Sequence, residues 1–168
     1  MISEDIPING AYIKVENTAK AILDLSAYYR SRFQLHLIGL TGSVGKTTTK
    51  EFTYLVLNAK YNTIKTLGNL NNEIGLPKML IQIDRNTQAA VIEMGMNHFG
   101  EISRLASAAK PTAAIITNIG VSHIENLGSR EGILKAKLEI LNGLCENAPL
   151  ILNGDNDLLS QVKSEKHK

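Results

Sequence analysis

Cysteine is almost absent from the 168-residue sequence, which contains only Cys145. A single cysteine cannot form an internal disulfide bond, and this excludes a small secreted scaffold held together by disulfides. We therefore expect a reducing, cytoplasmic location. Cys145 falls among apolar positions of an expected helix, where we predict a small buried side chain rather than a catalytic nucleophile.

Long apolar runs and blocks of like charge are also missing. No stretch approaches the roughly 18 apolar residues of a membrane span, and residues 1–5 lack the basic start of a signal peptide, so we expect neither. The 18 basic and 16 acidic residues leave a net charge of +2, with charges gathered only in the short tail at 163–168. This balance argues against a surface for nucleic acid or membranes.

The length suits one compact domain with a substantial core. Short β-branched runs alternate with amphipathic patterns, which predicts strands at 35–39, 62–65, 89–94, 113–117 and 150–153. This alternation predicts an α/β fold with a mostly parallel sheet and helices on both faces. Ligands of such sheets bind beyond the carboxyl ends of the strands.

Three helices are predicted to turn an apolar face toward the core. The helix that follows the first strand would bury Phe52, Leu55, Val56 and Ala59. A helix near the N-terminus, capped by Asn17, would bury Ile22, Leu25 and Tyr29. A third helix, ended by Pro111, would bury Ile102, Leu105, Ala106 and Ala109.

A phosphate-binding loop (P-loop) is predicted where the first strand ends and a helix begins, at Thr41-Gly42-Ser43-Val44-Gly45-Lys46-Thr47-Thr48-Thr49. Glycines let backbone N–H groups approach phosphate oxygens, and the helix N-terminus adds its positive dipole end. Lys46 is expected to reach the β- and γ-phosphates of a nucleoside triphosphate, and the hydroxyl of Thr47 to bind the accompanying Mg²⁺. The first glycine of the general motif falls one residue early, at Gly39.

Polar residues follow the other predicted strands, so we expect them at the same edge of the sheet, Asn118 among them. Glu93 suits a Mg²⁺ ligand, with an ordinary charged strand end as the alternative. His123 is a candidate to bind a metal or orient a water, or is a solvated loop histidine. Side chains that suit capping or substrate contacts are Asn69, Asn71, Asn72, Asn97 and His98.

Lys137 interrupts the apolar stripe of an expected helix that also carries Ile133, Ile140, Leu141 and Leu144. Burial lowers the pKa of an amine, and an uncharged amine can add carbon dioxide to become a carbamate that holds a cation. The alternative is a lysine whose stem packs on the core while its ammonium group reaches water. The residues alone leave both interpretations open.

The P-loop run, together with residues 68–73, 93–98 and 117–120, closely resembles the ATP-binding central domain of Mur ligases, over about residues 11–157. Thr49-Lys50-Glu51 and residues 93–102 resemble the family's enzyme that joins D-alanyl-D-alanine to UDP-N-acetylmuramoyl-tripeptide. The resemblance implies ATP and Mg²⁺, those two molecules as substrates, and activation of the tripeptide carboxylate as an acyl phosphate.

The resemblance also implies roles for individual residues. Lys46, Lys137 and His123 would take part in catalysis, with Thr47 and Glu93 holding one Mg²⁺ and His123 with a carbamate on Lys137 holding another. The nucleotide would be bound by Thr41, Gly42, Ser43, Val44, Gly45, Lys46, Thr47, Thr48 and Asn118. The residues that we expect to bind substrate are Asn69, Asn71, Asn72, Asn97 and His98. Val44 stands where many relatives carry asparagine, which should matter little because backbone amides hold the phosphates.

The family pattern implies that residues 1–16 are the end of an N-terminal domain and its linker. Residues 17–168 would then be the central domain, truncated before its last strands, with the C-terminal domain absent, so we expect a piece of a longer ligase. Two other hypotheses stay open: a nucleotide-binding module without turnover of its own, and a ligase related to folylpolyglutamate synthetase with another acceptor. The sequence does not identify the diamino acid of the tripeptide or the oligomeric state.

Overall fold

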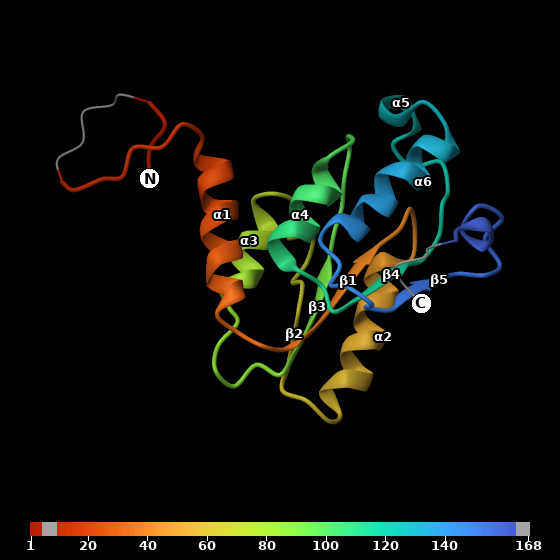
Figure 1. Cartoon of the computed structure of the whole chain (residues 1–168), viewed down its shortest axis with the longest axis horizontal. Coiled ribbons are helices and arrows are strands. Elements are labelled where there is room, and N and C mark those ends of the chain that lie inside the picture. The colour runs from red at the N-terminus through yellow and green to blue at the C-terminus, as the bar shows by residue number, and fades with distance from the viewer. Residues whose placement is uncertain (5–9, 164–168) are drawn as a thin grey trace.

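A computed structural model describes residues 1–4 and 10–163 of the chain (Figure 1). Within them, five strands form one parallel sheet in the order β2-β3-β1-β4-β5. The strands are β1 (His36–Thr41), β2 (Thr63–Lys65), β3 (Ala89–Glu93), β4 (Ala113–Ile116) and β5 (Leu150–Leu152). The predicted strands are all confirmed, with bounds that move by one or two residues.

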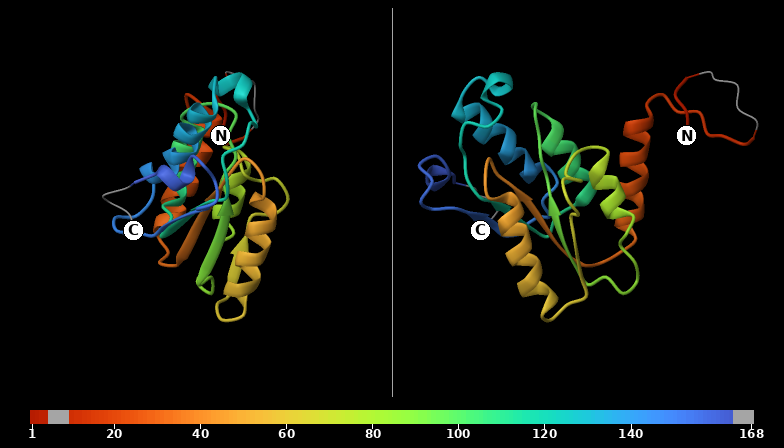
Figure 2. Two further views of the ribbon diagram at one scale, coloured as in Figure 1. Left: turned by 90° about the vertical axis from the view of Figure 1, so that its right-hand side faces the viewer. Right: turned by 180° about the vertical axis from the view of Figure 1, so that it is seen from behind.

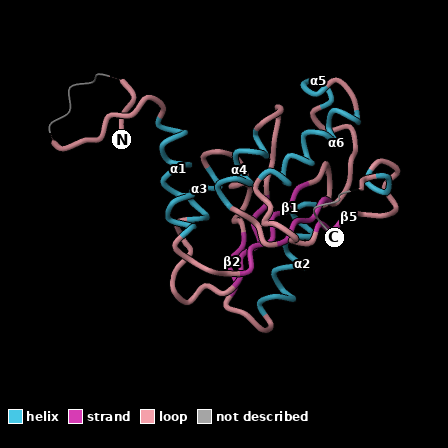
Figure 3. The backbone as a smooth tube through the Cα atoms, viewed as in Figure 1, coloured by secondary structure: helices cyan, strands magenta, loops and turns pink. Residues whose placement is uncertain are grey.

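Helices cover both faces of this sheet. They are α1 (Thr18–Ser31), α2 (Lys46–Asn58), α3 (Gly75–Leu80), α4 (Glu101–Ala109), α5 (Ile124–Leu127) and α6 (Arg130–Leu138), with 3₁₀ turns η1 (Glu139–Asn142) and η2 (Leu159–Gln161). Helix α2 packs on β1, β2 and β3 from one side, and α3 and α4 lie on the other (Figure 2). The strands run through the middle of the molecule (Figure 3). The predicted α/β architecture is confirmed.

Strands β1 and β3 lie side by side in the sheet, β1 at its centre. Strand β3 is buried along its whole length, as expected of a parallel strand covered on both faces. A Cβ atom on Gly39 of β1 would lie 2.9 Å from the Pro111 ring and 3.3 Å from the Ile140 side chain. The early glycine of the motif therefore permits close packing against the layer that contains η1, rather than shaping the P-loop.

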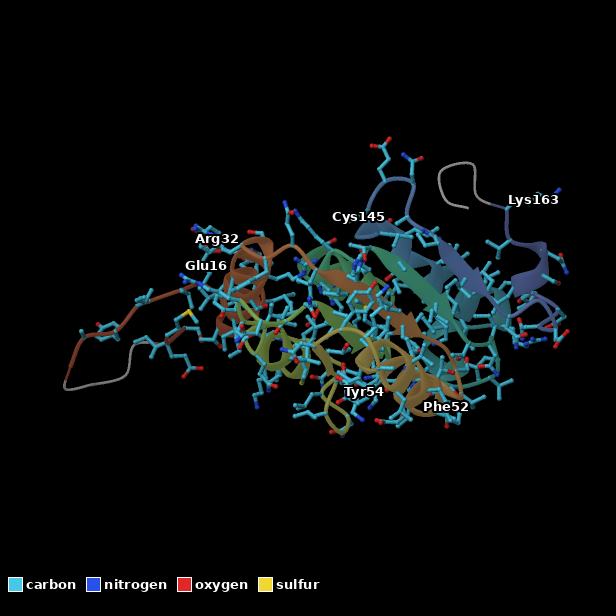
Figure 4. The ribbon with its side chains drawn as sticks, turned by 90° about the horizontal axis from the view of Figure 1, so that it is seen from below. Glu16, Arg32, Phe52, Tyr54, Cys145 and Lys163 are labelled. Atoms are coloured by element: carbon cyan, nitrogen blue, oxygen red, sulfur yellow. The ribbon has the colours of Figure 1, made fainter. Side chains whose placement is uncertain are left out.

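The predicted inner face of α4 is confirmed, because Ile102, Leu105, Ala106 and Ala109 are all fully buried. The predicted inner face of α2 is wrong. Phe52, Leu55 and Val56 are 65%, 60% and 74% exposed, and Figure 4 shows Phe52 at the outer side of the helix. Ala59 is exposed as well. The side of α2 that faces the sheet instead buries Lys50, which pairs with Glu93.

The predicted inner face of α1 is partly wrong. The cap is confirmed, since Asn17 Oδ1 accepts from Lys20 N at 2.9 Å, and the half-buried Tyr29 donates its hydroxyl to Ile83 O at 2.8 Å. Ile22 and Leu25 are exposed, however. The buried residues of α1 are Leu23, Ser26 and Arg30. Arg30 donates to Ala109 O at 3.0 Å, so a buried cation satisfies a carbonyl at the end of α4.

The prediction for Cys145 is wrong, because this side chain is exposed and follows η1 in a loop (Figure 4). The helical segment ends at Asn142, and a Cβ on Gly143 would lie 2.1 Å from the backbone of Ala106. Gly143 therefore brings the chain directly against α4 and turns it out of the helix before Cys145.

Residues 10–14 are exposed and extend away from the sheet, with an isolated bridge between Ile2 and Lys14 (Figure 1). The domain end and linker predicted at 1–16 include residues 5–9, and the charged tail at 163–168 includes residues 164–168; both of these stretches lie outside the described residues. Among the residues that the structure describes, no helix combines the length and apolar character needed to cross a membrane.

Candidate active site

The strand order places the end of β1 between β3 and β4. From β1 the chain passes through α2 to β2 on one side, whereas the connection from β3 through α4 crosses to β4 on the other. Such a switch in direction opens a crevice at the carboxyl ends of the strands, where parallel sheets bind their ligands. The P-loop begins at this point.

The P-loop is braced by the segment that follows β4. The backbone N–H of Ser43 donates to Asn118 O at 3.1 Å, and that of Val44 donates to Asn118 Oδ1 at 2.9 Å. Thr117 Oγ1 donates to Val44 O at 2.6 Å, and Gly120 N donates to Ser43 Oγ at 2.9 Å. Asn118 thus lies at the loop, as the sequence predicts, and contacts its backbone.

Two glycines allow the loop its path. Gly42 has a φ of 153°, and a Cβ there would lie 1.9 Å from Thr117 Oγ1. Gly45 has a φ of 79°, in the left-handed region, directly before α2 begins. Lys46 folds back over the loop and donates from Nζ to Gly42 O at 2.9 Å. The loop therefore gathers the first turn of α2 and a lysine amine at one place.

Glu93 is 3% exposed and stands beside this loop, paired in register with Leu40 of β1. Thr47 Oγ1 donates to Glu93 Oε2 at 3.5 Å, and Asn71 Nδ2 donates to Oε1 at 2.8 Å. A hydroxyl and a carboxylate are oxygen ligands that fit Mg²⁺, which usually keeps water and phosphate oxygens in its remaining positions. Within the described ranges, no group of three or more His, Cys, Asp or Glu could hold a metal. A Mg²⁺ ion here would therefore need oxygens from the nucleotide or water.

A cavity of about 210 Å³ brings many of the predicted residues together. Those that line it are Gly42, Lys46, Asn71, Asn72, Asn97, His123 and Lys137. Asn69 and His98 are exposed and do not line it, so their substrate contacts stay predictions. A larger cavity of about 580 Å³ between α1 and α4 contains none of the predicted site residues.

Lys137 is 3% exposed on α6, so the snorkelling alternative is not what the structure adopts. Burial, followed by the charge of nearby Lys46, lowers the pKa of Lys137 to about 7. A large fraction of this amine is consequently uncharged at neutral pH and able to react with carbon dioxide. His123 is half-buried, with a φ of 65° directly before α5.

Residues 40–168 match a protein-family model that is described as "Mur ligase middle domain". The chain belongs to the Mur ligase family. It is 50% identical, over 158 residues, to the UDP-N-acetylmuramoyl-tripeptide--D-alanyl-D-alanine ligase of Bacillus subtilis, an alignment that covers 94% of this chain and 35% of that protein. The chain thus spans about a third of the length of this curated relative.

Solved structures agree with this assignment. MurF from Acinetobacter baumannii superposes with a TM-score of 0.90 at 39% identity, covering 95% of this chain and 35% of that chain. MurF from Thermotoga maritima, solved in complex with ADP, gives a TM-score of 0.90 at 32% identity, covering 98% and 39%. The sheet and helices described above are therefore those of a Mur ligase central domain.

Several supporting residues of this Mur ligase domain were not predicted as site residues from the sequence. Thr117 and Gly120 flank the predicted Asn118, and their position after a strand was the available signal. Thr66 Oγ1 accepts a hydrogen bond from Glu93 N at 2.9 Å. No sequence pattern distinguishes Thr66 from other threonines near strand ends. Lys50 lies one helical turn after Lys46, and its burial followed from no pattern in the sequence.

Proposed function

We propose that this chain is the nucleotide-binding part of an ATP-dependent ligase that adds D-alanyl-D-alanine to UDP-N-acetylmuramoyl-tripeptide during peptidoglycan precursor synthesis. The observation that carries the proposal is the cavity at the P-loop, where Lys46, Asn97, His123 and Lys137 meet. Similarity to the Bacillus subtilis ligase of that name supports the choice of substrates, and the ADP complex of the Thermotoga maritima relative supports the nucleotide.

In the proposed reaction, a carboxylate oxygen of the tripeptide attacks the γ-phosphorus of ATP, and the bond to the departing ADP breaks. The amine of D-alanyl-D-alanine then attacks the acyl carbon, expels phosphate and loses a proton, which leaves an amide. Lys46 would offset the repulsion between the carboxylate and the polyphosphate. Mg²⁺ held by Thr47 and Glu93 would neutralise phosphate charge, while the cavity positions the reactants.

We propose a second cation between His123 and a carbamate on Lys137. Both residues line the cavity, and the lowered pKa of Lys137 favours the uncharged amine from which a carbamate forms. Carbon dioxide would add to the amine nitrogen with loss of one proton, giving an anionic carbamate. Its oxygens are hard donors of the kind that divalent cations prefer.

We also propose the domain division: residues 1–16 as the end of a preceding domain with its linker, and residues 17–168 as the ATP-binding domain. The cap at Asn17 and the exposure of residues 10–14 support this boundary. The reducing, cytoplasmic location expected for a single cysteine stays a prediction, and the oligomeric state is left open.

A chimera with the Bacillus subtilis relative tests the function. The aligned segment of that ligase would be replaced by this chain, and phosphate release measured with UDP-N-acetylmuramoyl-tripeptide and D-alanyl-D-alanine present together and singly. Sustained release that needs both substrates, and that Lys46→Ala removes, is the expected result. The same protein carrying its own segment is the positive control.

Two results would replace the proposal with one of its alternatives. Release stimulated by a pteroyl-glutamate, and not by the muramoyl peptide, would favour a ligase related to folylpolyglutamate synthetase. Nucleotide binding by a folded chimera without release under any of these conditions would favour a binding module without turnover.

A further inference from the structure

Lys50 is a charged residue that is buried, and it has no role in the mechanism proposed above. Its side chain is 2% exposed on the side of α2 that faces β3. Lys46 lines the cavity at the P-loop, whereas Lys50 does not, so its ammonium group lies behind the phosphate site rather than in it. Lysines are rarely buried to this extent unless a partner compensates the charge.

The partners of Lys50 are two carboxylates. Its Nζ lies 3.8 Å from Glu93 Oε2 and 3.6 Å from Glu51 Oε1. Glu51 already has a second cation, because it pairs with Lys65 of β2, whose amine also lies 4.2 Å from the centre of the Tyr54 ring. Glu93 has no other cation among the ion pairs of the described residues, so Lys50 is the charge that balances it.

The carboxylate of Glu93 is therefore held from several directions. Asn71, in the loop after β2, donates to Oε1 at 2.8 Å, and Thr47 donates to Oε2 at 3.5 Å. Lys50 approaches the same Oε2 atom from within the protein. Together these groups define how the carboxylate plane is turned relative to the hydroxyl of Thr47, the other proposed Mg²⁺ ligand.

We propose that Lys50 is a positioning residue for the metal site: it holds Glu93 in the orientation that receives Mg²⁺ bound to the nucleotide, without touching the nucleotide itself. This inference rests on the proposed function. Mg²⁺ requires near-ideal octahedral geometry, and among the described residues the proposed site has one carboxylate, Glu93, and one hydroxyl, Thr47, so a turned carboxylate would leave one protein ligand. Groups that orient metal ligands commonly matter almost as much as the ligands.

The test is the gain in nucleotide affinity that Mg²⁺ provides, measured by calorimetric titration of a non-hydrolysable ATP analogue into this chain with Mg²⁺ and with EDTA. Lys50→Met should lower that gain by about tenfold or more, as other outer-sphere changes do. It should leave the affinity in EDTA unchanged, because Lys50 contacts no phosphate. Lys50→Arg, which keeps the charge, should restore most of the gain.

Matched variants separate positioning from a general loss of stability. Glu51→Gln removes the other carboxylate near Lys50 and should leave the gain from Mg²⁺ unchanged. In a Glu93→Gln background, Lys50→Met should have no further effect on the gain, since its action passes through Glu93. Circular dichroism establishes that each variant is folded, and Lys50→Gln replaces Lys50→Met if the latter is not.

A folded Lys50→Met or Lys50→Gln variant with an undiminished gain from Mg²⁺ would overturn the inference while leaving the proposed function in place. An equal loss of affinity with Mg²⁺ and with EDTA would also overturn it, because that would indicate a general disturbance of the P-loop. Failure of the unsubstituted folded chain to bind the analogue would contradict the proposed function itself, and the inference with it.

Discussion

Two lysine side chains, Lys46 and Lys137, line the cavity at the end of β1, and their surroundings differ. Lys46 is held over the P-loop by Gly42 O at 2.9 Å, on a part of the chain where anions are expected. Lys137 is buried on α6, where the loss of water and the neighbouring charge of Lys46 both disfavour its protonated form. Lys46 is therefore the residue that can offer a positive charge to a nucleoside triphosphate, whereas Lys137 is poised to react as an uncharged amine.

The lowered pKa of Lys137 predicts a dependence of stability on pH. Its folded value is about 7 against an ordinary 10.5, so between these pH values the unfolded chain binds a proton that the folded chain has released. The free energy of unfolding should therefore rise with pH across this window, relative to Lys137→Met. Urea titrations at several pH values, in buffers free of carbon dioxide, would measure this. A constant difference between the two proteins would contradict the assignment.

The close packing around Gly42 should make substitution of this residue destabilising. A methyl group there would meet Thr117 Oγ1 at 1.9 Å, and the φ of 153° is one that other residues rarely adopt. Gly42→Ala should lower the free energy of unfolding by about 1–3 kcal/mol, as overpacking does. Gly154→Ala is the control, because no atom lies within 4 Å of its Cβ position, and it should stay within about 0.5 kcal/mol of the parent. Equal stability of the two variants would refute the close approach.

Among the helices, hydrophobic periodicity predicts the inward face of α4 correctly, succeeds only in part for α1 and fails for α2. In α2 the charged Lys50 is buried in place of the expected apolar residues, because Glu93 lies opposite it on a strand that is distant in sequence. The exception in α1 is Arg30, which is buried because the end of α4 presents carbonyls to it. Both partners come from other elements, so a pattern read along a single helix cannot identify them.

The contacts of the buried Arg30 side chain are expected to stabilise the packing of α1. It donates to Ala109 O at 3.0 Å and to Phe33 O at 2.7 Å, and so joins α1 to the end of α4. Arg30→Met should lower the free energy of unfolding by about 1–3 kcal/mol, because buried carbonyls lose their donor. Arg32→Met, on the exposed side of the same segment, should change it by less than about 0.5 kcal/mol. Urea denaturation would measure both, and similar losses would show that the buried contacts are not what matters.

At the scale of the whole molecule, the order of the strands gathers the site. The sequence predicts the strands, the P-loop and the edge at which polar residues gather, since these follow from alternation and one local motif. It does not give the order β2-β3-β1-β4-β5, which places Glu93 on one side of the P-loop and Thr117 on the other. The hydrogen bonds from Ser43 and Val44 to Asn118, which follows β4, depend on that order and could not be predicted from the sequence.

We expect the P-loop of this chain to bind a nucleoside triphosphate through Lys46. Calorimetric titration of Mg²⁺ and a non-hydrolysable ATP analogue into the chain, in parallel with Lys46→Ala, would test this. We predict saturable binding by the unsubstituted chain and no detectable binding by Lys46→Ala, with both proteins folded by circular dichroism. Equal binding by the two proteins, or none by the folded unsubstituted chain, would contradict the claim.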